Sequence, residues 1–282
     1  MKTFKLVVFM LSVLTCFSCA GANKKEMKAS EIIKLMKSGK PVQVVDRIII
    51  GDLDFTAAGE PFIVNGQMLQ SEILSNIYFE QCVFMGKVTS NSKLRNNPIK
   101  CVFRNNIVLT GCDFRGEVDL DGAVVFGMVN FSRSTFREKA NFNNIVVWAK
   151  DNYFQEINTE KEFTMINASI AGNLSLQSSV FKANVSFQEI SVAGAIMFNF
   201  CSFEQGAGLD LMEISGKAFF NRASFAKRAN FSSSRFMNRT NFASVDFKER
   251  ANFEKAFFLT TVIFEGVERD KLILTDAVFI NK

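Results

Sequence analysis

The chain has 282 residues, of which 48% are hydrophobic and 22% charged, and its formal net charge is +5. It contains no His, which excludes Ser-His-Asp and Cys-His nucleophile systems, imidazole acid/base chemistry and zinc sites with His ligands. There are 32 Phe against two Tyr and one Trp. Because Phe has no polar group for a wet surface, this excess indicates a buried aromatic core.

The N-terminus has the features of an export signal over residues 1–19. Lys2 and Lys5 supply a positive start, and residues 6–15 form an apolar stretch that is too short to cross a bilayer. Small Ser18 before Cys19 resembles a bacterial lipoprotein signal, and this resemblance implies lipidation of Cys19.

Two other processing sites stay open in this segment. Cys16 is an alternative lipidation target, although Thr15 before it fits the pattern less well. Ordinary cleavage after Ala22 is the rival interpretation, because residues 20–22 have a small-x-small form. Lipidation predicts an exported, lipid-anchored envelope protein, whereas cleavage after Ala22 predicts a soluble periplasmic or secreted protein.

A basic tether over residues 20–29 and a short helix over residues 30–39 are expected next. Ser30 is the expected N-cap of this helix, and Gly39 marks its end. Two turns of helix are not stable alone, so the helix is expected to cap the end of the following domain.

The rest of the chain is a repeat that its Phe residues reveal. Large apolar residues recur at alternating steps of five and six, so the unit has eleven residues; the clearest run is Phe220, Phe225, Phe231, Phe236, Phe242, Phe247, Phe253 and Phe258. We call these the comb positions. Upstream, the comb passes through Val125 or Phe126.

A small residue stands two places before each comb position, as Ala229 stands before Phe231. This in-out-in alternation is typical of a very short strand with two inward side chains. A solenoid satisfies every position, because each coil buries its Phe against the equivalent Phe of the next.

Residues 226–231, 237–242 and 248–253 read AKRANF, MNRTNF and KERANF and resemble the pentapeptide repeat family. The resemblance implies an all-β, right-handed quadrilateral β-helix over residues 41–282. Alternating steps predict coils of about 22 residues, and about nine coils make a rod about 45 Å long. The phase breaks near residues 86–100 and 150–163, where loops or bulges are expected.

Four cysteines beyond the signal, Cys82, Cys101, Cys112 and Cys201, each lie two residues before a comb Phe. They are therefore interpreted as slim inward residues. A disulfide is the alternative in an exported protein, but Cys101 and Cys112 are one unit apart and are expected on different faces. There is no CxxC pair in the body of the chain, and no metal site or cofactor is expected.

Basic residues gather between Lys217 and Lys255, where there are nine against three acidic ones. Four of them recur at steps of eleven: Lys217, Arg228, Arg239 and Arg250. Such a step puts alternate members in vertical register on one corner. The residues form either a solvated corner or a cationic strip for a polyanion such as an acidic glycan or a phosphorylated lipid. Nucleic acid is not an expected partner, and DNA mimicry, known in the resembled family, needs an acidic rod.

No catalytic residue is assigned. Asp52 with Asp54, and Asp119 with Asp121, share a strand face, but strand geometry alone turns such pairs outward. We expect a non-catalytic, membrane-tethered scaffold for protein or surface interactions, and a homodimer through the C-terminal end. The alternative is binding, or cleavage, of an acidic glycan along the basic strip.

Removal of one comb ring tests the stacked core. Phe231→Ala is expected to lower the free energy of unfolding by about 3–5 kcal/mol, because it leaves a cavity between packed rings. Thermal denaturation measures this effect, and an unchanged melting temperature contradicts the stacked-Phe arrangement.

Overall fold

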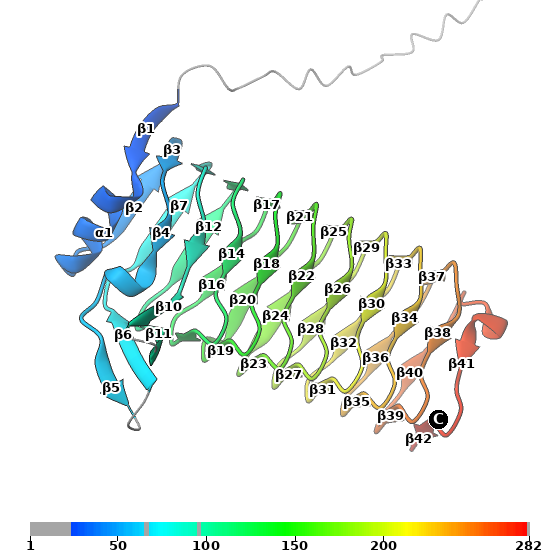
Figure 1. Cartoon of the computed structure of the whole chain (residues 1–282). Coiled ribbons are helices and arrows are strands. Elements are labelled where there is room, and N and C mark those ends of the chain that lie inside the picture. Colours follow the sequence, from blue (N-terminus) through cyan, green and yellow to red (C-terminus); the bar gives the residue numbers. More distant parts are fainter. Residues whose placement is uncertain (1–23, 65–67, 95–96, 281–282) are drawn as a thin grey trace, which may run out of the picture.

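The computed structural model describes residues 24–64, 68–94 and 97–280. They form an all-β solenoid of about 11 turns with a single short α-helix at its N-terminal end, which confirms the expected fold class. Figure 1 shows an elongated rod whose coils follow one another from the N-terminal to the C-terminal end. Four sheets run along the rod, and their strands are paired almost entirely in parallel.

Most strands have only two residues. Sheet A contains β1 (Lys25–Lys28), β3 (Arg47–Ile50), β8 (Val83–Phe84), β13 (Asp113–Phe114), β17 (Thr135–Phe136), β21 (Asn158–Thr159), β25 (Val180–Phe181), β29 (Ser202–Phe203), β33 (Ser224–Phe225) and β37 (Asp246–Phe247). Sheet B contains β2 (Val42–Val45), β7 (Ile77–Glu80), β12 (Ile107–Thr110), β16 (Val129–Asn130), β20 (Asp151–Tyr153), β24 (Asn173–Ser175), β28 (Ile196–Met197), β32 (Ala218–Phe219), β36 (Thr240–Asn241) and β40 (Val262–Ile263).

The other two sheets complete each coil. Sheet C contains β4 (Leu53–Asp54), β9 (Val88–Thr89), β14 (Val118–Asp119), β18 (Ala140–Asn141), β22 (Phe163–Thr164), β26 (Val185–Ser186), β30 (Ala207–Gly208), β34 (Ala229–Asn230), β38 (Ala251–Asn252) and β41 (Leu272–Ile273). Sheet D contains β5 (Phe62–Val64), β6 (Met68–Ile73), β10 (Asn91–Leu94), β11 (Asn97–Phe103), β15 (Val124–Val125), β19 (Val146–Val147), β23 (Ser169–Ile170), β27 (Ser191–Val192), β31 (Glu213–Ile214), β35 (Arg235–Phe236), β39 (Phe257–Phe258) and β42 (Val278–Phe279).

Each regular coil visits the sheets in the order B, A, C, D and then returns to B, so that Phe203 of one coil pairs with Phe225 of the next. Equivalent positions of neighbouring regular coils have a sequence separation of 22. The rings of Phe203 and Phe225 stack with centroids 4.4 Å apart and planes 4° apart. Phe231 stacks on Phe253 at 4.6 Å and 1°. The inward columns are therefore stacks of rings.

The comb residues are the core of the rod. All eight of those named from Phe220 to Phe258 are 0–4% exposed. At the ambiguous comb position it is Val125 that is buried, whereas Phe126 is exposed.

Within each five-residue step of the comb, the chain turns at a residue with a left-handed backbone conformation. These residues recur every eleven positions and include Glu156, Asn167, Ser178, Glu189, Phe200 and Leu211, with φ between 53° and 60°. Such a φ is uncommon for a residue other than Gly. Backbone hydrogen bonds between coils hold it in place, as at Phe200, whose N–H donates to the Asn221 carbonyl at 3.2 Å.

The rod has more turns than the nine expected, because the comb begins late in the sequence while the solenoid begins at β2. The expected tether also differs, since Lys25–Lys28 is strand β1, paired in parallel with β3. The helix α1 spans Ala29–Lys37, and Lys28 rather than Ser30 occupies its N-cap. The helix buries Ile32 and Met36 against the core at the N-terminal end of the rod (Figure 1).

The first phase break, near residues 86–100, contains a hairpin. Strand β10 pairs antiparallel with β11, and this addition lengthens the coil, so that Asp113 pairs with Val83 across the insertion. A second antiparallel pair, β5 with β6, extends sheet D beside the hairpin. In Figure 1 this pair projects from the N-terminal part of the rod. Two 3₁₀ turns, η1 (Phe55–Ala57) and η2 (Arg269–Lys271), complete the described elements.

The second phase break, near residues 150–163, holds one extra residue, because Asn130 pairs with Tyr153. It also holds an exchange of side-chain sizes. Thr159 occupies a comb position between Phe136 and Phe181. Phe163 occupies the small position of sheet C between Ala140 and Val185.

The Phe163 ring compensates for the small Thr159 side chain. Its centroid lies 6.1 Å from that of Phe136 and 5.6 Å from that of Phe181, so it packs against both neighbours of Thr159 in the column. Phe163 is fully buried, and the Thr159 hydroxyl is buried without a hydrogen-bond partner among the described residues. The large Phe163 side chain therefore fills the space that the small Thr159 side chain leaves, and the two departures from the repeat compensate for each other.

A double-mutant cycle tests this compensation. Phe163→Ala is expected to cost about 3–5 kcal/mol, because it opens a cavity, and Thr159→Phe about 1–3 kcal/mol, because it overpacks the same space. The double variant restores the regular order of small and large residues and is expected to be more stable than Phe163→Ala alone. Chemical denaturation measures all four chains, and additive effects contradict the compensation.

Candidate interaction surface

The outward side chains of sheet D form a ladder near the N-terminal half of the rod. In each coil the residue after the buried comb residue turns outward, because side chains alternate along a strand. On successive coils of sheet D these outward residues are Leu74, Arg104, Phe126 and Trp148. We call Arg104, Phe126 and Trp148 the aromatic ladder.

The three side chains of the ladder are stacked. The Arg104 guanidinium lies 4.7 Å from the centroid of Phe126, and its Nε pairs with the Glu72 carboxylate. The rings of Phe126 and Trp148 are 6.4 Å apart and inclined by only 15°. The exposed fractions are 44% for Phe126 and 58% for Trp148, so both rings present apolar area to solvent.

The ladder ends at Trp148. The next two residues of this outward column are Ala171 and Ala193, both small and exposed. Ala171, the next residue in the column, is too small to cover the Trp148 ring, which is 58% exposed. The next corner residue, Gly172, has no side chain. It also has no room for one, because an added Cβ would lie 2.1 Å from the Lys150 carbonyl oxygen. Beyond Trp148 the outward column therefore consists of small side chains instead of stacked rings.

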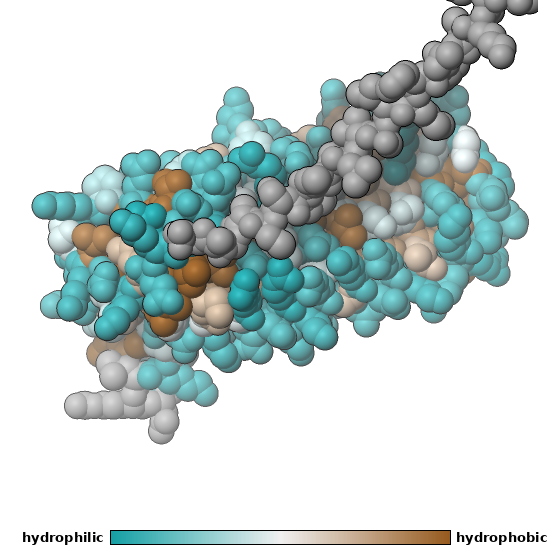
Figure 2. Space-filling view, turned by 90° about the horizontal axis from the view of Figure 1, so that it is seen from above, coloured by the Kyte–Doolittle hydropathy of each residue, from teal (hydrophilic) through white to brown (hydrophobic). Residues whose placement is uncertain are grey.

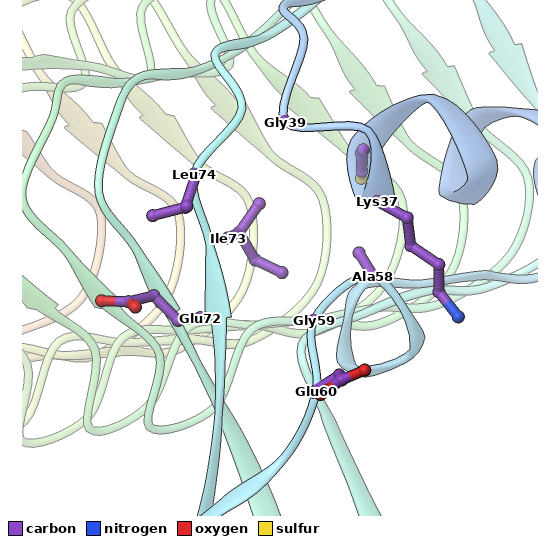
Figure 3. Close-up of a pocket in the computed structure, with 9 residues that line it drawn as sticks. Lys37, Gly39, Ala58, Gly59, Glu60, Glu72, Ile73 and Leu74 are labelled. Carbon is purple, nitrogen blue, oxygen red and sulfur yellow. The ribbon is translucent and has the colours of Figure 1, made fainter.

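A pocket of about 350 Å³ lies beside the start of the ladder, between the end of α1, the turn after η1 and strand β6 (Figure 3). Lys37, Glu60, Glu72 and Leu74 are among its lining residues. Figure 3 draws the Lys37 and Glu60 side chains on the side of α1 and the turn, the Glu72 side chain on β6, and that of Leu74 just after this strand. Glu72 is already paired with Arg104, so the pocket connects directly to the ladder.

The four basic residues at steps of eleven do not form one strip. Lys217 and Arg239 lie at the corner between sheets D and B, before the paired residues Ala218 and Thr240. Arg228 and Arg250 lie at the corner between sheets A and C, before the paired strands β34 and β38. These corners share no sheet and are diagonally opposite. A step of eleven is half a coil, so the residues alternate between two sides of the rod.

None of these four residues forms an ion pair with another described residue. Arg137, at the same corner as Arg228 but nearer the N-terminus, contrasts with them: it pairs with Asp113 at 2.6 Å and with Glu160 at 3.2 Å. The hydrogen bond and charge of Asp113 raise the pKa of Arg137. Arg228 also lines a shallow hollow of about 480 Å³ on sheet C, with Asn184, Gly206, Gly208 and Asn230.

The two pairs of Asp residues that share a strand face, Asp52 with Asp54 and Asp119 with Asp121, form hydrogen bonds or ion pairs with neighbouring residues. The Asp119 carboxylate accepts hydrogen bonds from the Asp121 N–H at 3.1 Å and the Asn141 side chain at 3.0 Å. Asp121 forms an ion pair with Lys100. Asp52 accepts the Lys87 N–H, and Asp54 caps η1 through the Thr56 N–H. In the part of the chain that is described, no group of three or more Cys, Asp or Glu residues is arranged to hold a metal ion.

The exterior is otherwise strongly polar. Figure 2 looks at the rod from above the view of Figure 1 and shows mostly hydrophilic side chains, with separate hydrophobic patches between them. Among the described residues, no helix is long and apolar enough to span a membrane. Cys19 and the rest of the expected signal lie outside the described residues.

Comparison with known families agrees with the coil geometry. Residues 99–146 match the family model of pentapeptide repeats, with nine copies. The matched stretch runs from β11 to β19, and the same four sheets continue from it to β42. No curated protein and no solved structure matches the chain. One repeat architecture therefore extends well beyond the matched residues.

The aromatic ladder was missed by sequence reasoning, which assigned the aromatic residues to the core. Outward residues of a solenoid have no packing period, so neither Phe126 nor Trp148 stands out from the comb. The available signal was their position: each directly follows a buried Val, Val125 or Val147, in a strand of sheet D.

Proposed function

We propose that this protein is a non-catalytic scaffold tethered to the cell envelope, and that the aromatic ladder is its contact surface for a protein partner or another envelope component. The observation that supports this function best is the exposure of two stacked aromatic rings on a rod whose other aromatic residues are mostly buried. Exposed apolar area bordered by polar residues is typical of an interaction site.

The proposed tether is a lipid on Cys19. Strand β1 begins at Lys25, six residues later, and six extended residues span at most about 20 Å. The N-terminal end of the rod would therefore stay close to the membrane. Lys25 and Lys28 are exposed and add positive charge at this end, which favours an anionic lipid surface, whereas Lys24 is paired with Asp46.

Polyanion binding is the alternative function, now confined to one corner. Arg228, which lines the hollow of sheet C, and Arg250 precede paired strands and lie on neighbouring coils of one corner, without ion pairs among the described residues. Their positive charges suit the acidic groups of a glycan. Lys217 and Arg239 lie too far around the rod to contact the same linear ligand.

End-to-end pairing remains a separate proposal, supported by the last described strands β40, β41 and β42, each of which has a strand partner on one side only.

Cell fractionation combined with photo-crosslinking tests the scaffold. In a host with a bacterial envelope, the full chain is expected in the membrane fraction with a lipid mass on Cys19. Cys19→Ser is expected to release it, whereas the control Cys16→Ser is not. A photo-crosslinking residue in place of Trp148 is expected to capture a partner that the same residue in place of Phe200, on another corner, does not.

Two outcomes contradict this proposal. An unmodified mature chain starting at Asn23 rules out the tether, and equal crosslinking from both positions rules out the ladder as the contact surface.

An array of acidic glycans separates the alternative function from the scaffold. If the sheet C corner binds a polyanion, Arg228→Ala/Arg250→Ala is expected to reduce binding at least tenfold, because both cationic contacts are lost. The matched control Lys217→Ala/Arg239→Ala removes equal charge from the opposite corner and is expected to retain binding. Equal losses in both variants indicate a general charge effect and contradict a built site.

A further inference from the structure

Two cysteines that lie far apart in the sequence occupy the same position on neighbouring coils. Cys82 directly precedes β8, Cys112 directly precedes β13, and the two strands pair in register, with Val83 opposite Asp113. The Asp113 N–H donates to the Cys82 carbonyl at 2.9 Å. Both cysteines are free thiols, 1% and 2% exposed.

The hairpin of β10 and β11 creates this alignment. A regular coil places residues at a sequence separation of 22 in register, as it does for Cys112 and Ser134, which precede the paired strands β13 and β17. The longer coil that contains the hairpin places residues at a separation of 30 in register instead. The other two cysteines within the described residues have no such neighbour: Cys101 lies in sheet D opposite Ser71, and Cys201 lies between the equivalent residues Ser179 and Ala223.

The spacing of the coils suits a covalent link. Adjacent strands lie about 4.7–4.9 Å apart, and disulfides join residues whose Cα atoms are about 4.4–6.8 Å apart. Both thiols point into the core, where Cys82 Sγ lies 3.5 Å from the Val44 carbonyl oxygen and Cys112 Sγ 3.9 Å from that of Phe79. Val44 and Phe79 are themselves paired residues of adjacent coils.

We propose that Cys82 and Cys112 form a disulfide that joins the two neighbouring coils on either side of the hairpin when the chain meets a disulfide oxidant such as oxidised glutathione.

The two thiols differ in a way that suits thiol–disulfide exchange. A hydrogen bond from the Cys112 thiol lowers the pKa of Cys82 to about 7, and the same contact raises the pKa of Cys112. Burial raises the pKa of Cys101 and of Cys201. Because the thiolate is the nucleophile, Cys82 is the expected attacking group.

The reaction balances with one molecule of oxidant. The Cys82 thiolate attacks one sulfur of the oxidant, which breaks the oxidant's S–S bond and releases one thiol. Cys112 then loses its proton and attacks Cys82 Sγ in the mixed disulfide, which releases the second thiol and forms the Cys82–Cys112 bond. Two protein thiols are oxidised and one small disulfide is reduced to two thiols. Since both thiols are buried in the folded rod, we expect the exchange to proceed in partly folded chains, in which the two coils are already paired but Cys82 is still open to the oxidant.

Peptide mapping of the full chain provides the test. The protein is refolded with oxidised and reduced glutathione, its remaining thiols are alkylated in denaturant, and trypsin then separates the four cysteines beyond the expected signal into residues 48–87, 101–104, 105–115 and 183–217. We expect residues 48–87 linked to residues 105–115, with Cys101 and Cys201 alkylated. The linked chain is also expected to melt several degrees higher than the reduced chain, because the bond constrains the unfolded state.

Matched variants separate this bond from other thiol chemistry. Cys82→Ser and Cys112→Ser are each expected to abolish the link and the thermal shift, whereas Cys201→Ser, at an equivalent buried position, retains both. Alkylation of both Cys82 and Cys112 after oxidative refolding overturns the proposal, as does a link from either residue to Cys101 or Cys201.

Discussion

The whole structure depends on one constraint, which is that each large inward side chain packs on the equivalent side chain one coil away. Phe203 on Phe225 and Phe231 on Phe253 are almost parallel rings separated by about one strand spacing. The backbone must therefore repeat the same path in every coil, with left-handed residues at fixed corners and parallel hydrogen bonds between coils. An insertion is tolerated only where it leaves the inward positions in register. The hairpin of β10 and β11 does so by adding residues at the edge of sheet D, and the extra residue before Tyr153 does so as a local bulge.

This constraint explains which parts of the fold the sequence could reveal. The Phe comb predicts the core, the coil length and the solenoid, because inward positions are subject to the same packing demand in every coil. It does not predict the first coils, where Val42, Ile49 and Leu53 fill inward positions without Phe. It also does not predict strand β1, since a basic segment such as Lys25–Lys28 becomes a strand only when β3 offers it a free edge. The exchange of Thr159 and Phe163 breaks the pattern for a different reason: packing conserves the volume of a neighbourhood, not the size of each side chain.

Outward side chains do not have to pack on the equivalent side chain of the next coil, so the candidate site is harder to predict than the core. Outward residues in one column are independent of the core, so Arg104, Phe126, Trp148 and Ala171 can follow one another with no period. The basic residues illustrate the converse error. Their regular step of eleven reflects the half-coil period of the backbone, and it distributes Lys217 and Arg239 to one corner and Arg228 and Arg250 to the opposite one. A regular spacing in a solenoid sequence is therefore evidence of the coil before it is evidence of a binding site.

Distances along such a rod are counted in coils, and the length of each coil decides which side chains meet. Cys101 and Cys112 are closer in sequence than Cys82 and Cys112, yet the former lie in different sheets and the latter in one inward column. The hairpin brings about this meeting, because it changes the separation of equivalent positions from 22 to 30 for a single coil without disturbing the coils around it. The same coil contains Arg104, the first rung of the aromatic ladder, on its outer side. One insertion thus places two thiols in the same inward column, whereas Arg104 meets Phe126 through the regular separation of 22.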